Sequence, residues 1–139
     1  MSDNFFDSNV LLYLFDNDAP HKRDTARRLV DRALEAEDSA ISFQVVQETL
    51  NVIIGKIPVP PASDRAEEFL QDTLIPLWKV NPSIDLYRNA ISVQSRYGFS
   101  YYDSLIVSAA LDAGCKTLYS EDMQHGQKIE RLTIENPFR

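Results

Sequence analysis

The stretch Phe5-Phe6-Asp7-Ser8-Asn9-Val10 sets a pattern from which the fold of this chain can be predicted. Two large apolar residues followed at once by an acid indicate a short buried strand that ends at a carboxylate. Ser8 or Asn9 is then in place to cap a helix over residues 10–15. The opening of the chain therefore predicts a strand followed directly by a helix.

The same alternation of strand and helix continues along the chain. We expect strands at residues 5–6, 40–43, 77–80, 117–119 and 132–134, and helices at 10–15, 21–35, 44–54, 66–74, 84–97 and 101–113. Parallel strands need crossover connections, and helices supply them. The alternation therefore predicts an α/β fold, with a mostly parallel sheet of about four or five strands and helices on both faces.

Glycine and proline mark the expected ends of several elements. Gly55, Gly98 and Gly114 are placed to end helices. The prolines that follow the first of these glycines predict a loop inside the domain, namely Pro58, Pro60 and Pro61.

The length and composition favour one cytoplasmic domain over residues 1–139. A chain of 139 residues suffices for one core, and no apolar run approaches the roughly 18 residues of a membrane helix. The chain starts with acids where a secretory signal would carry positive charge. Cys115 is the only cysteine, and a free thiol suits a reducing compartment.

The net charge of -7 argues against a protein that coats nucleic acid, because phosphate binding rests on Lys and Arg. Carboxylates that hold divalent cations would reverse the local sign of the field and bring an acidic protein to an acidic substrate. One helix does carry a basic patch, formed by Lys22, Arg23, Arg27 and Arg28. Such a patch is more typical of a solvated helix face than of an RNA contact.

Asp7 and Asp122 each follow a predicted strand. In parallel sheets, sites lie outside the carboxyl ends of the strands, so both acids are candidates for a site. Each also has a simpler interpretation, Asp7 as a helix cap and Asp122 as a turn residue.

Asp103 lies in the first turn of a helix that is apolar on nearly every side. The helix dipole explains its charge but not its place on a buried stripe, where an unpaired carboxylate would cost several kcal/mol or become protonated. Glu48 flanks the apolar face of its own helix, and a solvated glutamate is the competing interpretation.

Four carboxylates without histidine or cysteine partners favour Mg²⁺ or Mn²⁺ over zinc. Such ions lower the pKa of a water and hold a phosphodiester for in-line displacement. Asp7, Glu48, Asp103 and Asp122 together therefore suggest a phosphodiesterase site.

The chain resembles the PIN domain family, and within it the VapC-like toxins of bacterial and archaeal toxin–antitoxin modules. The resemblance rests on four segments in the family's order, which span nearly the whole chain: Phe5-Phe6-Asp7-Ser8-Asn9-Val10-Leu11, Ser42-Phe43-Gln44-Val45-Val46-Gln47-Glu48, Tyr102-Asp103-Ser104-Leu105-Ile106-Val107-Ser108-Ala109-Ala110 and Leu118-Tyr119-Ser120-Glu121-Asp122-Met123-Gln124-His125-Gly126. It implies one PIN-like domain that hydrolyses RNA with Mg²⁺ or Mn²⁺.

By this resemblance, the metal ligands and catalytic acids are Asp7, Glu48, Asp103 and Asp122, and the supporting hydroxyls are Ser8 and Ser120, where the family more often has threonine. The resemblance also implies hydrolysis without a covalent intermediate on the protein. It further implies a small antitoxin with a basic segment as partner, and a homodimer.

Several residues near these motifs have open roles. Glu121 adjoins Asp122, but adjacent residues leaving a strand usually point apart, so only one should face the site. His125 is close enough in sequence to carry a proton or bind a metal, although a loop histidine usually does neither. The aromatic residues that could stack on unpaired bases, yet are more often core or interface, are Trp78, Tyr101 and Tyr102.

Two other functions fit an acid after the first strand. An aspartyl-phosphate site would pair it with a lysine at a late strand's carboxyl end, but Lys116 precedes its strand. A non-catalytic module that binds a basic peptide in an acidic pocket is the second alternative.

Overall fold

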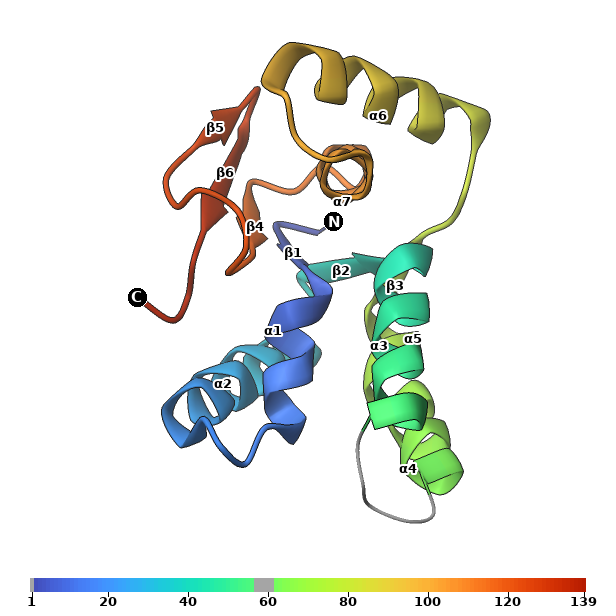
Figure 1. Cartoon of the computed structure of the whole chain (residues 1–139), viewed down its shortest axis with the longest axis vertical. Coiled ribbons are helices and arrows are strands. Elements are labelled where there is room, and N and C mark those ends of the chain that lie inside the picture. The colour runs from blue at the N-terminus through green and yellow to red at the C-terminus, as the bar shows by residue number, and fades with distance from the viewer. Residues whose placement is uncertain (1, 57–61) are drawn as a thin grey trace.

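Across residues 2–56 and 62–139, which the computed structural model describes, six strands form one sheet in the order β3-β2-β1-β4-β6-β5 (Figure 1). They are β1 (Asn4–Phe6), β2 (Ser39–Ser42), β3 (Trp78–Val80), β4 (Thr117–Tyr119), β5 (Lys128–Ile129) and β6 (Leu132–Glu135). Neighbouring strands are parallel except β5 and β6. The predicted mostly parallel sheet is confirmed, with β5 as an additional strand.

Helices connect most of these strands. They are α1 (Ser8–Leu12) with the 3-10 turn η1 (Tyr13–Phe15), α2 (Pro20–Ala36), α3 (Phe43–Lys56), α4 (Ala62–Phe69) with the π-helical turn η2 (Leu70–Leu74), α5 (Ile75–Leu77), α6 (Ile84–Tyr97) and α7 (Tyr101–Asp112). Among the described residues, no helix has the length and apolar character needed to cross a membrane.

Several predicted boundaries differ from the structure, most of them by one or two residues. The first helix begins at Ser8 and is capped by Asp7, not by Ser8 or Asn9. Gly55 does not end its helix, because α3 continues to Lys56. The helix predicted at residues 66–74 begins at Ala62 and ends in η2. The predicted proline loop falls largely on residues 57–61, which lie outside the described part of the chain.

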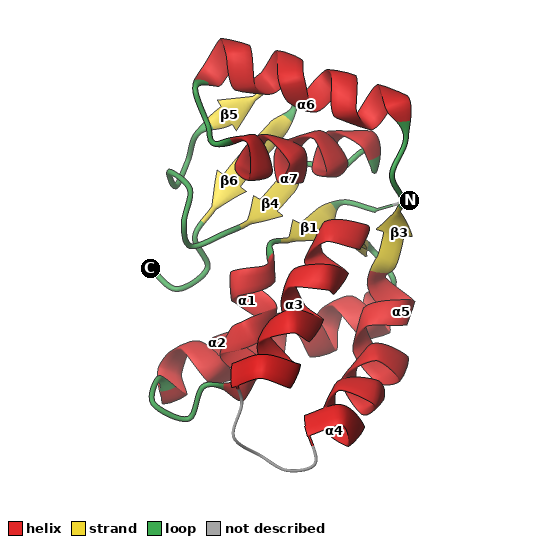
Figure 2. Cartoon of the chain, turned by 45° about the vertical axis from the view of Figure 1, so that its right-hand side comes forward, coloured by secondary structure: helices red, strands yellow, loops and turns green. Residues whose placement is uncertain are grey.

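The order of the strands determines where the helices lie. The chain moves from β1 to β2 and β3 in one direction, then returns past β1 to β4. Right-handed crossovers place the helices of these two directions on opposite faces of the sheet. Figure 2 shows α6 and α7 stacked together on the side of the sheet away from α2. The direction reverses between β1 and β4, so this sheet has its topological switch point there.

Buried side chains surround the switch point. Phe5 in β1 and Leu118 in β4 are fully buried. In α7, every residue from 104 to 110 is buried, as expected for a helix that is apolar on nearly every side. The hydroxyl of Ser108 in this helix donates to the Leu86 carbonyl of α6 at 2.9 Å. The burial of residues 104–110 and this bond therefore hold α7 in the core and against α6.

Candidate active site

The four predicted acids come from four different elements around the switch point. Asp7 follows β1, and its N–H donates to the Tyr119 carbonyl at the end of β4 at 2.9 Å. Asp122 lies in the loop after β4, Glu48 in the second turn of α3, and Asp103 in the first turn of α7. Hydrogen bonds and mutual charge interactions link them, so the structure brings together side chains that are far apart in sequence.

Asp7 is the most buried of these acids, with 6% of its surface exposed. Its Oδ2 accepts from the Ser120 hydroxyl at 2.8 Å, and its Oδ1 accepts from the Ser8 N–H at 2.8 Å. Burial raises the pKa of Asp7 to about 6, and the charges of Glu48 and Asp103 add to this rise, although the two hydrogen bonds oppose it. The ionised form of Asp7 is therefore less favourable than that of an exposed carboxylate, and a nearby cation would stabilise it.

Asp103 is held by the cap of its helix. Its N–H donates to the Ser100 hydroxyl at 3.1 Å, and Ser100 is the N-cap of α7. Partial burial raises the pKa of Asp103; the contact with Ser100 opposes this rise, and the charge of Asp122 adds to it. Asp122 therefore lies close enough to Asp103 for its charge to act on the Asp103 carboxyl group.

Ser100→Ala is expected to lower the free energy of unfolding by about 1 kcal/mol, because it leaves the first N–H groups of α7 without their capping oxygen. Urea unfolding measures this change. Ser92→Ala is the matched control, since Ser92 is exposed in the interior of α6 and caps nothing. Equal stability of the two variants would contradict a capping role for Ser100.

Glu48 is held from both sides. Its Oε1 accepts from the Ser8 hydroxyl at 3.0 Å, and its Oε2 accepts from the Gln44 amide at 3.4 Å. The same amide donates to the Tyr102 carbonyl, next to Asp103, at 3.2 Å. Gln44 is buried and thus joins α3 to α7. Sequence reasoning did not single it out, although a polar residue four positions before Glu48 in an apolar run was the available signal.

Asn9 lies between two of the acids. Its amide nitrogen donates to Asp122 Oδ2 at 3.0 Å and contacts Asp7 Oδ2 at 3.5 Å. Its Oδ1 accepts from the Glu121 N–H at 3.3 Å, which fixes the orientation of the amide. Sequence analysis considered Asn9 only as a helix cap and as part of a family motif. In the structure it supplies a polarised N–H group between two carboxylates.

Glu121 is directed away from the acids. Its Oε2 lies 2.6 Å from Lys22 Nζ, and its Oε1 accepts from the Tyr13 hydroxyl. Burial acts to raise the pKa of Glu121, but the hydrogen bonds from Lys22 and Tyr13 outweigh it and lower this pKa. The hydrogen bonds that Lys22 makes with Glu121 and with the Tyr13 hydroxyl raise the pKa of Lys22. Glu121 and Lys22 are therefore partners of each other.

The other basic residues of the patch contact their own neighbours. Arg23 donates to Asn17, Arg27 pairs with Asp31, and Arg28 donates to Thr25. This agrees with the interpretation of the patch as a helix face.

The remaining candidates also have defined surroundings. Nδ1 of His125 accepts from the Asn136 N–H at 3.0 Å, so this nitrogen is engaged by the backbone after β6. Trp78 lies on the edge strand β3 and is 37% exposed. Tyr101 and Tyr102, just before Asp103, are 41% and 65% exposed. These three aromatic side chains therefore do not belong to the buried core.

The donor chemistry of the four acids fits a hard divalent cation. Carboxylate oxygens are the ligands that Mg²⁺ and Mn²⁺ prefer. Asp7 is destabilised by its burial and by neighbouring charge, and the Asn9 amide lies where positive charge is needed. Within residues 2–56 and 62–139, however, no three acidic, histidine or cysteine side chains are placed closely enough to enclose an ion. Binding would thus require the acids to close around the ion.

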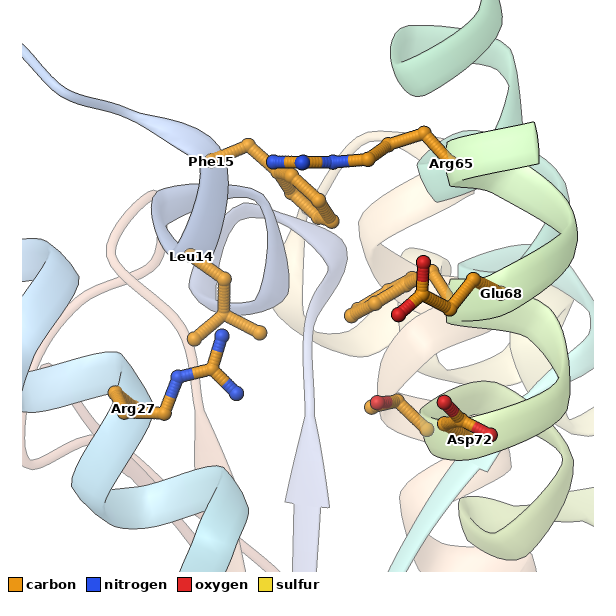
Figure 3. A pocket seen from close by; sticks show the side chains of 8 residues that line it. Leu14, Phe15, Arg27, Arg65, Glu68 and Asp72 are labelled. Carbon is orange, nitrogen blue, oxygen red and sulfur yellow. The ribbon is translucent and has the colours of Figure 1, made fainter. Parts of the chain in front are cut away.

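A separate hollow of about 260 Å³ lies between η1, α2 and the α4–η2 helix (Figure 3). Its lining includes the apolar side chains of Leu14 and Phe69, and the Arg65 guanidinium lies 5.6 Å from the centre of the Phe15 ring. None of the four acids lines it. The hollow and the acids are therefore distinct features.

The sequence profile of the PIN domain family matches residues 5–128. The match covers most of the chain, and this chain belongs to the PIN domain family. No curated protein sequence gives a significant match.

Several solved structures share the fold of this chain. A chain of a toxin–antitoxin complex from Klebsiella pneumoniae is 21% identical, with a TM-score of 0.66 over 97% of this chain and 98% of that chain. VapC20 of Mycobacterium tuberculosis, described as a sarcin–ricin loop cleaving toxin, is 19% identical, with a TM-score of 0.60 over 85% and 88% of the two chains. A chain of VapBC2 from Rickettsia felis, solved with a promoter DNA fragment, is 17% identical, with a TM-score of 0.68 over 96% and 97%. These likenesses show the fold.

Proposed function

We propose that this chain is a metal-dependent endoribonuclease and the toxin of a toxin–antitoxin pair. The observation that carries the proposal is the meeting of Asp7, Glu48, Asp103 and Asp122 at the switch point of a PIN-family sheet. The similarity in fold to VapC20, a toxin that cleaves the sarcin–ricin loop, supports RNA as the substrate.

The four acids would hold Mg²⁺ or Mn²⁺, which when bound makes a water more acidic and offsets the charge of a phosphodiester. The hydroxyls of Ser120 and Ser8 fix the orientations of Asp7 and Glu48. Each hydroxyl engages one carboxylate oxygen and leaves further lone pairs for an ion. The first turn of α7 directs its N–H groups and positive dipole end toward the same region, which favours a bound phosphate.

An aspartyl-phosphate mechanism fits the structure less well. Lys116 precedes β4, whose first residue Thr117 pairs with Asn4 at the start of β1. Lys116 therefore lies at the edge of the sheet opposite Asp7, where it cannot contact a phosphorylated Asp7.

The partner we propose is a small antitoxin with a basic segment. The net charge of -7 attracts a basic chain, and an exposed Asp122 beside Asp103 offers it a local acidic surface. The comparison structures from K. pneumoniae and R. felis come from toxin–antitoxin assemblies. We also propose that the toxin forms a homodimer and acts in the cytoplasm.

Cleavage of RNA by the purified chain after EDTA treatment tests the proposed activity. We expect cleavage on addition of Mg²⁺ or Mn²⁺ and none in EDTA. Undiminished cleavage in EDTA would contradict the metal requirement. Binding of a basic peptide without cleavage of any RNA under these conditions would instead favour the non-catalytic module, and a covalent phosphate gained from a small phosphodonor would favour the aspartyl-phosphate alternative.

A further inference from the structure

We propose that Glu121, anchored by Lys22 and Tyr13, is a positioning residue that orients Asp122 toward Asp7 through the Asn9 amide. This inference rests on the proposed function in assigning Asp122 to the metal site. The inference gives a role to two charged residues whose roles the sequence left open. Glu121 was considered as a further acid of the site, and Lys22 as part of a patch that could contact RNA.

The anchor is a compact group of side chains from three parts of the chain. Lys22 Nζ of α2 lies 2.6 Å from Glu121 Oε2 and donates to the Tyr13 hydroxyl at 3.2 Å. The Tyr13 hydroxyl in turn donates to the other oxygen of Glu121. The ammonium group lies 5.0 Å from the centre of the Tyr13 ring and 5.9 Å from that of Phe138. Both carboxylate oxygens of Glu121 are therefore held, one by Tyr13 of η1 and the other by Lys22 of α2.

The backbone of Glu121 connects this anchor to the acids. Its N–H donates to Asn9 Oδ1 at 3.3 Å, while the Asn9 amide nitrogen donates to Asp122 at 3.0 Å and contacts Asp7 at 3.5 Å. Glu121 and Asp122 are adjacent but contact different partners. Because the Glu121 side chain is held against Lys22, the Asp122 side chain extends in a fixed direction from the loop after β4.

The ion pair also removes an unwanted charge. A free Glu121 would add another carboxylate beside Asp122. The side chains of Lys22 and Glu121 are only 40% and 23% exposed, so the pair is partly shielded from water and holds a defined geometry.

The Asn9 side-chain amide is the direct probe of this arrangement in metal-free protein. We expect Lys22→Met and Glu121→Gln to shift its ¹H–¹⁵N signals and to speed exchange of its hydrogens with water. Arg27→Met is the matched control, because it removes one positive charge from the same helix and breaks only the exposed pair with Asp31. Unchanged Asn9 signals in both anchor variants, with the fold intact, would overturn the proposal.

Metal affinity and kinetics test the consequence. Partners that orient metal ligands typically contribute about 10- to 100-fold in affinity or activity. We expect Lys22→Met and Glu121→Gln to weaken Mn²⁺ binding, followed by the electron paramagnetic resonance of free Mn²⁺, and to lower kcat by about this factor with little change in KM. Lys22→Arg should restore most of both, since arginine also pairs with a carboxylate.

The double variant that combines Lys22→Met with Glu121→Gln distinguishes a positioning role of Lys22 from a direct contact with RNA. If Lys22 acts through Glu121, the double variant should be no weaker in Mn²⁺ binding or kcat than the weaker single variant. A rise in KM for Lys22→Met, with kcat, Mn²⁺ binding and the Asn9 signals unchanged, would show that Lys22 contacts RNA and would overturn the proposal. If the wild-type chain neither binds Mn²⁺ nor cleaves RNA, the proposed function fails, and the Asn9 signals alone decide whether the anchor exists.

Discussion

Asp7→Asn and Asp103→Asn are each expected to lower metal-dependent RNA cleavage by about 10³-fold, which corresponds to roughly 4 kcal/mol of transition-state stabilisation. Each change removes a negative charge and a strong oxygen donor from the group of acids but keeps the shape of the side chain. At position 7, an asparagine can still accept from the Ser8 N–H and donate to the Ser120 hydroxyl, so the local structure should persist. Initial rates with RNA in excess Mg²⁺ or Mn²⁺ measure the effect.

Asp85→Asn provides the matched control, because it makes the same chemical change as the two test variants. Asp85 is an exposed acid in the first turn of α6 and is not one of the four acids of the site. This variant should cleave RNA at the wild-type rate. Circular dichroism and urea unfolding would confirm that all three variants are folded. Wild-type activity in either Asp7→Asn or Asp103→Asn would refute the assignment of that residue.

Asp7→Asn should also make the metal-free protein more stable at pH 7, by up to about 3 kcal/mol. The pKa of Asp7 is raised from 3.8 to about 6 in the folded chain, and each unit corresponds to about 1.4 kcal/mol. At pH 7 the wild-type protein must hold this buried carboxylate ionised, which the asparagine avoids. Urea unfolding in EDTA measures the difference between the two proteins.

The pH dependence of this difference follows from the direction of the shift. Between pH 3.8 and about 6, folded Asp7 binds more protons than unfolded Asp7, so its contribution to stability falls as the pH rises through this window. The advantage of Asp7→Asn should therefore be small near pH 4, grow toward pH 6 and level off above it. Mn²⁺ should stabilise the wild type more than the variant. A variant that is less stable than the wild type at pH 7 without metal would contradict this expectation.

Most of the fold could be predicted from local patterns. Ile84–Tyr97 was predicted to the residue because its apolar period is regular and Gly98 ends it in the left-handed conformation, with φ of 76°. Lys128–Ile129 was not predicted as a strand, because two residues in a polar stretch carry no period and pair only with the strand that follows them. The prediction that Gly55 ends its helix was wrong, because glycine can also adopt the helical conformation and α3 continues to Lys56.

The candidate site was predictable only in part. Three of the acids stand out through local signals, because Asp7 and Asp122 follow strands and Asp103 interrupts an apolar stripe, whereas Glu48 only flanks the apolar face of its helix. Their supporting contacts are not local: Ser120 reaches Asp7, and Asn9 reaches Asp122, across 113 positions in each case. The pairing of Lys22 with Glu121 spans 99 positions. Such partners depend on how the loop after β4 meets α1 and α2, which no window of sequence reveals.

A crystal structure of the chain grown with Mn²⁺ tests most directly whether the four acids share a cation. We expect an anomalous scattering peak within coordination distance, about 2.0 to 2.3 Å, of oxygens from at least Asp7 and Asp103. Glu48 and Asp122 should lie around the same ion, directly or through water. An ordered Mn²⁺ bound elsewhere, with these four carboxylates still too far apart to enclose an ion, would contradict the proposed metal site and the nuclease function built on it.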